Sequence, residues 1–248
     1  EQKIEAQNIP QLKMGTSDAE YMTLSFWVRS TRTGTFNVEF SDDDSSHHAV
    51  LKYTINNAAT WEYKTITIPP ATNTGTPTYD NTVGLTLDWW IVGGSSYNSS
   101  SADGTWQSFS STRRNYGGNT VFEDPDYWQL TGVQLEVGKN ATDFEHRPYG
   151  EELALCQRYY VEDSTGAADT PLLYFFQYSD SYKMLQIPFP VPMRSSTPTV
   201  VITMGTGSGT TGLTENYNRT SMQYKAFVNL ALGSTAAYIV GYTASAEL

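Results

Sequence analysis

The chain is poor in cysteine and in positive charge, and each shortage excludes a class of protein. Cys156 is the single cysteine among 248 residues, so no intrachain disulfide can form and apolar burial must stabilise the fold. Fifteen basic residues against 26 acidic ones give a net charge of −11, which disfavours nucleic acid and anionic lipid surfaces as partners. Apolar runs are also too short to span a membrane. We therefore expect neither nucleic-acid binding nor membrane insertion.

Alternation of apolar and polar residues dominates what is present. A period of two is typical of β-strands that bury one face. It occurs in Met22–Val28, Phe36–Phe40, Leu51–Ile55, Leu85–Ile91 and Val133–Val137. Many short strands with little helical pattern predict an all-β fold, with an antiparallel jelly-roll sandwich over residues 1–148.

A second domain is expected over residues 149–248, because the composition changes there. All six tryptophans lie before this region. One short helix is predicted to begin after Pro148 and to carry Leu153, Leu155 and Cys156. The strands predicted beyond it are Leu172–Tyr178, Tyr182–Phe189, Thr199–Met204, Met222–Ala231 and Ala237–Thr243, and the Gly205–Gly212 run is predicted as a flexible loop. We expect a smaller β-sandwich, joined to the first by the helix.

Several segments resemble a known family. They are TGVQLEVG (131–138), ATDFEHRPYGEELALCQRYY (141–160), MTLSFWVRSTRTGTF (22–36), TWEYKTITIP (60–69) and the final TASAEL. These runs are similar to the C-terminal part of tail-fibre and other receptor-binding proteins of tailed bacteriophages. The resemblance implies a jelly-roll domain like a carbohydrate-binding module, a distal β-domain and a homotrimer. It further implies an extracellular position at the tip of the virion's tail fibre, with a fibre shaft upstream of Glu1.

Catalytic groups are scarce in the sequence. The three histidines, His47, His48 and His146, have no serine or cysteine in a nucleophile context. His146 is interpreted as a structural hydrogen-bonding residue. An acid pair such as Asp88 with Glu136 would be the requirement for glycoside hydrolysis, but chance pairs are expected among 26 acids. We therefore predict that the protein is not an enzyme.

Metal-binding patterns are weak as well, and no cofactor is predicted. The segment 42–48 is rich in oxygen and nitrogen donors but lacks EF-hand or zinc spacing, so we interpret it as a solvated acidic turn. The family resemblance leaves one alternative open, a structural calcium between the first and last strands of the jelly roll. The segment 4–8 resembles the start of such a strand, whereas Gly132 stands where the last strand would supply an acid.

A carbohydrate site is the remaining candidate. Alternation places Trp27, Arg29, Asp88, Trp90, Gln134 and Glu136 on the outside of the first sandwich. A long polar loop, residues 93–120, contributes large aromatics that a flexible linker would lack. Sugars offer apolar faces and hydroxyls, which match aromatic rings and polar groups. The predicted carbohydrate-binding residues are Trp27, Arg29, Asp88, Trp90, Tyr97, Trp106 and Tyr116, and the loop or a neighbouring subunit is an alternative cover for the tryptophans.

The function expected from these patterns is adhesion. A phage receptor-binding protein of this kind would hold host cell-surface carbohydrate without cleaving it, as a homotrimer that raises avidity. Two alternatives remain. The chain could be a structural or trimerisation module of a virion fibre, or a polysaccharide depolymerase that uses an acid pair.

Overall fold

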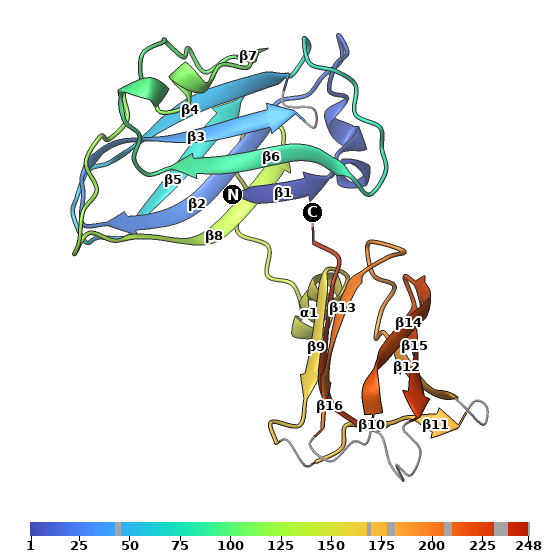
Figure 1. The fold of residues 1–248 in the computed structure, drawn as a ribbon. Helices are drawn as coiled ribbons and strands as arrows, with labels where there is room; N and C mark the ends of the chain where they lie inside the picture. Colours follow the sequence, from blue (N-terminus) through green and yellow to red (C-terminus); the bar gives the residue numbers. More distant parts are fainter. Residues whose placement is uncertain (43–45, 168–169, 178–181, 206–209, 231–237, 248) are drawn as a thin grey trace. The chain divides into compact units, whose positions relative to one another are not determined.

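The chain folds into two compact β-units, seen in a computed structural model (Figure 1). The structure describes residues 1–42, 46–167, 170–177, 182–205, 210–230 and 238–247. The first unit ends at His146 and the second begins at Arg147, close to the boundary at 148 inferred from composition. The predicted all-β class with antiparallel sheets and one α-helix is confirmed. No helix in the described ranges has the length and apolar character needed to span a membrane.

The first unit is a sandwich of a five-stranded and a three-stranded sheet. The five-stranded sheet runs in the order β1 (Gln2–Glu5), β6 (Val83–Trp90), β3 (Gly34–Asp42), β4 (His47–Ile55) and β7 (Gln107–Ser108). The three-stranded sheet runs β5 (Glu62–Ile68), β2 (Met22–Ser30), β8 (Trp128–Val137). All pairings are antiparallel. Short 3-10 turns lie at η1 (Ala6–Asn8), η2 (Pro10–Leu12), η3 (Ser95–Tyr97) and η4 (Ser111–Arg113).

The core lies between these two sheets and takes one side chain from every second position. Phe26 of β2 meets Tyr53 of β4 edge-on, with ring centroids 5.2 Å apart, and meets Trp89 of β6 at 6.2 Å. Phe36 stacks on the same Tyr53 ring at 5.6 Å. Buried aromatic and aliphatic area of this kind is the main source of stability. The alternation read from the sequence therefore correctly assigns the buried face of each central strand.

The second unit contains α1 (Tyr149–Gln157) and two further antiparallel sheets. One sheet has the order β10 (Leu173–Tyr174), β16 (Tyr238–Ser245), β13 (Thr199–Met204), with β9 (Tyr160–Ser164) also pairing with β16. The other has the order β11 (Phe176–Gln177), β12 (Tyr182–Pro188), β15 (Gln223–Leu230), β14 (Thr210–Thr220). Leu185, Ile187, Ile239 and Ala244 are among the buried residues of its core.

Three details of the sequence prediction are wrong. The predicted strand 172–178 is interrupted at Phe175 and contributes two short strands, β10 and β11, to different sheets. The predicted flexible loop 205–212 runs into β14, a strand that alternation did not detect, while residues 206–209 lie outside the described part. The acidic turn at 42–48 is not solvated at either end, since Asp42 and His48 are both buried; residues 43–45 lie outside the described ranges.

Glu62 fixes the turn between β4 and β5. Its carboxylate accepts hydrogen bonds from the backbone N–H groups of Asn56 and Asn57 at 2.9 and 2.7 Å and from Lys64 Nζ at 2.6 Å. Burial alone would raise the pKa of Glu62. The hydrogen bonds from Lys64, Asn57 and Asn56 outweigh burial and lower the pKa from 4.5 to about 2.

We predict that Glu62→Gln lowers the free energy of unfolding at pH 7 by about 1–2 kcal/mol. A carboxyl group whose pKa is lower in the folded state than in the unfolded state stabilises the fold at pH values above its unfolded pKa. This stabilisation is lost as the pH falls through the folded-state pKa. The deficit of the variant should therefore shrink between pH 4.5 and about 2. Urea unfolding at several pH values measures it. Glu20→Gln, at an exposed ion pair, is the control and should change little; an equal loss in both variants at pH 7 contradicts the prediction.

Candidate functional site

The outer face of the five-stranded sheet is organised around Glu39 of β3, which is fully buried. Its carboxylate accepts three hydrogen bonds, from His48 Nδ1 at 2.6 Å, Trp90 Nε1 at 2.8 Å and Arg114 Nε at 2.6 Å. Arg114 belongs to the long loop 93–120, so this ion pair holds the loop against the sheet. We call Glu39, His48, Asp88, Trp90 and Arg114 the Glu39 cluster.

Electrostatics in the Glu39 cluster favour the ionised carboxylate of Glu39. Burial alone would raise the pKa of Glu39, but the hydrogen bonds from His48 and Arg114 and the charge of Arg114 hold it below its usual value. Asp88 receives a 3.3 Å contact from Arg114 Nη2. Burial and the neighbouring charge of Glu39 raise the pKa of Asp88. One guanidinium thus serves two carboxylates, and Glu39 is buried with three of its roughly four acceptor positions occupied.

The loop also covers the aromatic residues predicted on this face. The Arg114 guanidinium lies 4.5 Å from the centre of the Trp90 ring. The centres of the Tyr97 and Trp90 rings are 5.1 Å apart. Lys52 Nζ lies 4.1 Å over Tyr116. Trp106 is buried in the core, and its Nε1 donates to the carbonyl oxygen of Pro69 at 2.9 Å. The prediction that Trp106 is a binding residue is therefore corrected: it is a core residue that anchors the loop.

The outer face of the three-stranded sheet is open by contrast. Trp27 of β2 pairs in register with Tyr63 of β5 and Thr131 of β8, and the Trp27 and Tyr63 rings are 5.4 Å apart. Phe144 lies in the segment after β8. Trp27, Tyr63 and Phe144 are each 44–45 % exposed. Together they line a hollow of about 300 Å³, here named the Trp27 hollow, whose lining residues are Ser25, Trp27, Tyr63, Thr131, Gly132, Phe144 and His146.

Local backbone geometry shapes this hollow. The register of β2 against β8 shifts between Ser25 and Trp27, which marks a β-bulge. Gly132 lies at the bulge with φ +59°, and a Cβ there would stand 3.3 Å from Trp27 Cδ1. Glycine is favoured in this left-handed conformation and leaves the indole room. His146 meets Phe144 edge-on at 5.0 Å, so the histidine predicted to be structural also lines the hollow.

The seven predicted site residues do not form one site. Trp27 and Arg29 lie on the open face of the three-stranded sheet, whereas Asp88 and Trp90 lie on the outer face of the five-stranded sheet, with Tyr97 and Tyr116 of the loop nearby. Glu136 pairs with Thr23 on the open face of the three-stranded sheet. The core of the sandwich therefore lies between Glu136 and Asp88. The proposed hydrolytic pair Asp88–Glu136 is therefore not assembled.

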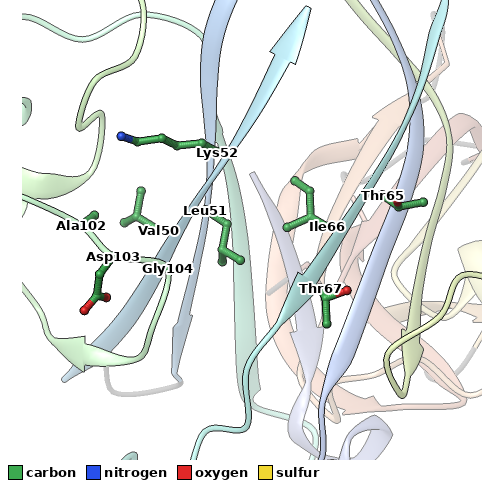
Figure 2. Close-up of a pocket in the computed structure, with 9 residues that line it drawn as sticks. All are labelled: Val50, Leu51, Lys52, Thr65, Ile66, Thr67, Ala102, Asp103 and Gly104. Atoms are coloured by element: carbon green, nitrogen blue, oxygen red, sulfur yellow. The ribbon is translucent and has the colours of Figure 1, made fainter.

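A second hollow, of about 420 Å³, opens at an edge of the sandwich (Figure 2). Leu51 of β4 and Ile66 of β5 face each other across it, and Thr65 and Thr67 lie beyond Ile66. Asp103 lies on the opposite rim, where it accepts hydrogen bonds from the N–H and hydroxyl of Thr105. None of the described residues that line this hollow is aromatic, so they do not supply the stacking surface found in the Trp27 hollow.

Acids of the two segments considered for metal binding have partners within the chain. Glu5 is buried and accepts a hydrogen bond from Gln7 Nε2 at 2.5 Å. Within the described ranges, no group of three or more His, Cys, Asp or Glu side chains is placed to hold a metal ion. Asp42 has local partners instead, the N–H of His47 and the hydroxyl of Ser46.

Sequence reasoning missed Tyr63, Phe144 and Gly132 as members of the hollow, and Glu39 and Arg114 as the clamp on the loop. Tyr63 had a detectable signal, because it alternates with Lys64 and Ile66 in a β-branched strand. Phe144 follows a turn and has no periodic pattern. The glutamate at 39 sits at a polar position of an alternating strand, which normally predicts exposure.

We predict that Glu39→Gln destabilises the first unit by about 3 kcal/mol, because it removes the charge of a buried pair and leaves Arg114 and His48 poorly matched. Asp88→Asn, which loses one long contact, should cost about 1 kcal/mol or less. Denaturant unfolding measures both variants, and limited proteolysis should show faster cleavage within loop 93–120 for the first. Equal effects of the two substitutions would show that Glu39 is not the principal tether.

Comparisons with known proteins give no family assignment. Searches against protein-family models, curated proteins and solved structures find no match for this chain.

Proposed function

We propose that the first unit binds carbohydrate at the Trp27 hollow without cleaving it. Exposed indole, phenol and phenyl rings line one open hollow together with Ser25, Thr131 and His146. Such rings match the apolar faces of a sugar, while the hydroxyls and imidazole match its hydroxyl groups. The open ring surface of Trp27 is the observation on which this proposal rests, since leaving it in water is costly.

A non-catalytic role accords with the positions of the acids. Asp88 and Glu136 lie on opposite sheets, and Glu39 already accepts three hydrogen bonds. Glycoside hydrolysis requires two carboxyl groups that flank one bond. These residues offer no such arrangement, which favours adhesion over the depolymerase alternative. Incubation with host polysaccharide should release no new reducing ends.

We predict that Trp27→Ala abolishes saccharide binding, with a loss of at least tenfold in affinity, while the fold is retained. A glycan array read with the intact protein identifies ligands, and titration calorimetry measures the variants. Tyr97→Ala is the matched control, because Tyr97 is similarly exposed but lies beside Trp90 on the other sheet. Loss of binding in Tyr97→Ala with full binding in Trp27→Ala would move the site to the Glu39 cluster and contradict the proposal.

Self-association of the second unit is the other part of this proposal, and a homotrimer is the form that the family resemblance suggests. None of the nine residues of α1 is buried. Tyr149 is 80 % exposed, and Leu153 and Leu155 are 39 % and 47 % exposed. A helix this short is marginal unless it packs against something. A further copy of the chain would bury these leucines, and linked copies would raise avidity for weakly bound sugars.

We predict that the protein has about three times the chain mass of 27.6 kDa in solution, and that Leu155→Glu converts it to monomer. Light scattering after gel filtration measures the mass. Val121→Glu, at a similarly exposed apolar residue of the first unit, should leave the mass unchanged. A monomeric wild-type protein would contradict the trimer.

We propose, finally, that the chain acts at the tip of a phage tail fibre as a receptor-binding protein. This step depends on the sequence resemblance, and carbohydrate binding by the hollow is the property it requires. A purely structural or trimerisation role is the alternative. It would be favoured if the trimer formed normally and no saccharide bound.

A further inference from the structure

Among the arginines whose side chains the structure describes, Arg29 stands out because its guanidinium has no described carboxylate or carbonyl partner. The Nε atom of Arg29 is buried, and no hydrogen-bond acceptor reaches it within the described residues. Its contact is with the Tyr127 ring, whose centre lies 5.4 Å from Cζ. Arg32 and Arg114, in comparison, each bind a carboxylate through Nε. A ligand cannot reach an atom that has no accessible surface, so only the Nη groups of Arg29, which also have no hydrogen-bond acceptor among the described residues, can bind one.

Arg29 does not line the Trp27 hollow itself but lies next to Trp27 on the same strand. Arg29 and Trp27 lie on the same face of β2, two residues and roughly 7 Å apart, and Gln129 of β8 is the register partner of Arg29. A sugar ring that stacks on Trp27 would carry its substituents into reach of the guanidinium. The outer edge of the guanidinium plane, with its two Nη groups, is therefore the part of Arg29 that can donate to a ligand.

Local charge favours an anion here, although the whole chain carries −11. The register neighbours on this face, Gln129 and Thr131, are uncharged. The nearest acid of the preceding loop, Asp126, is already engaged by Arg32 and Thr31. Glu136 lies toward the other end of β8, opposite Thr23, and accepts hydrogen bonds from Thr142. Among the described residues, Arg29 is thus a positive charge without a competing carboxylate bound to it.

We infer that the saccharide bound at the Trp27 hollow is acidic, with a carboxylate that pairs with Arg29. This inference rests on the proposed carbohydrate binding and adds the ligand class to it. The two parallel N–H groups of a guanidinium edge match the two oxygens of a carboxylate, which gives a charge-assisted and directional contact. The ring would supply stacking on Trp27 and Tyr63, and the carboxylate would select among sugars.

The test uses matched pairs of oligosaccharides, in which one member carries a hexuronic acid and the other the corresponding neutral hexose. Wild-type protein should bind the acidic member about tenfold more tightly, and added salt should reduce that preference. Arg29→Gln should remove the preference while binding of the neutral member persists. Arg29→Lys keeps the charge but loses the two-donor edge, and should retain only part of the preference. Arg113→Gln, at a second unpaired Nε in loop 93–120, is the control and should behave like wild type.

The outcomes separate this inference from the proposed function. Equal affinity for both members of each pair, with binding still lost in Trp27→Ala, overturns the acidic ligand and leaves carbohydrate binding in place. A preference for sulfated over carboxylated members overturns the carboxylate assignment. Equal loss of both members in Arg29→Gln assigns Arg29 a structural role. Absence of any saccharide binding by the correctly folded wild-type trimer overturns both proposals.

Discussion

Burial of one face of every central strand is the constraint on which the first unit depends. The rings of Phe26, Phe36 and Tyr53 pack between the sheets, and no strand can shift by one residue without moving such rings into water. Register in turn fixes what each strand presents outward. Thus the same packing that stabilises the sandwich also places Trp27 and Arg29 on one outer face and Glu39 and Asp88 on the other.

The two outer faces are completed in different ways. On the five-stranded sheet, the buried Glu39 carboxylate pairs with Arg114 of loop 93–120. The Arg114 side chain in turn lies over the ring of Trp90. On the three-stranded sheet, no comparable loop of the described chain lies over Trp27 and Tyr63, and the short segment with Phe144 only borders them. Trp27 and Trp90 occupy equivalent outward positions in their strands but differ in how open their rings are to a ligand. Trp90 lies beside the Glu39–Arg114 ion pair that holds the loop, whereas Trp27 does not.

Alternation predicts much of the fold but only part of the site. It correctly assigns Trp27, Arg29, Asp88 and Trp90 to the outside of their strands, since that depends on local period alone. It cannot tell which sheet a strand joins, so it merged residues from opposite faces into one surface. Trp106 and Tyr97 lie in a loop without period. The burial of Trp106 depends on its contact with Pro69, and the position of Tyr97 depends on its contact with Trp90. Those tertiary contacts are not encoded in local pattern.

The edge strand β5 has a consequence for how copies of the chain can meet. Lys64 pairs with Phe26 in register, at a position that points toward the core, and its ammonium is held by Glu62. A foreign strand added along this edge would have to strip water from that ammonium, and inward-directed lysines are a known guard against sheet-to-sheet polymerisation. The β5 edge is thereby guarded against strand addition, so units held at high local density, as on a crowded surface, are less prone to aggregate through it.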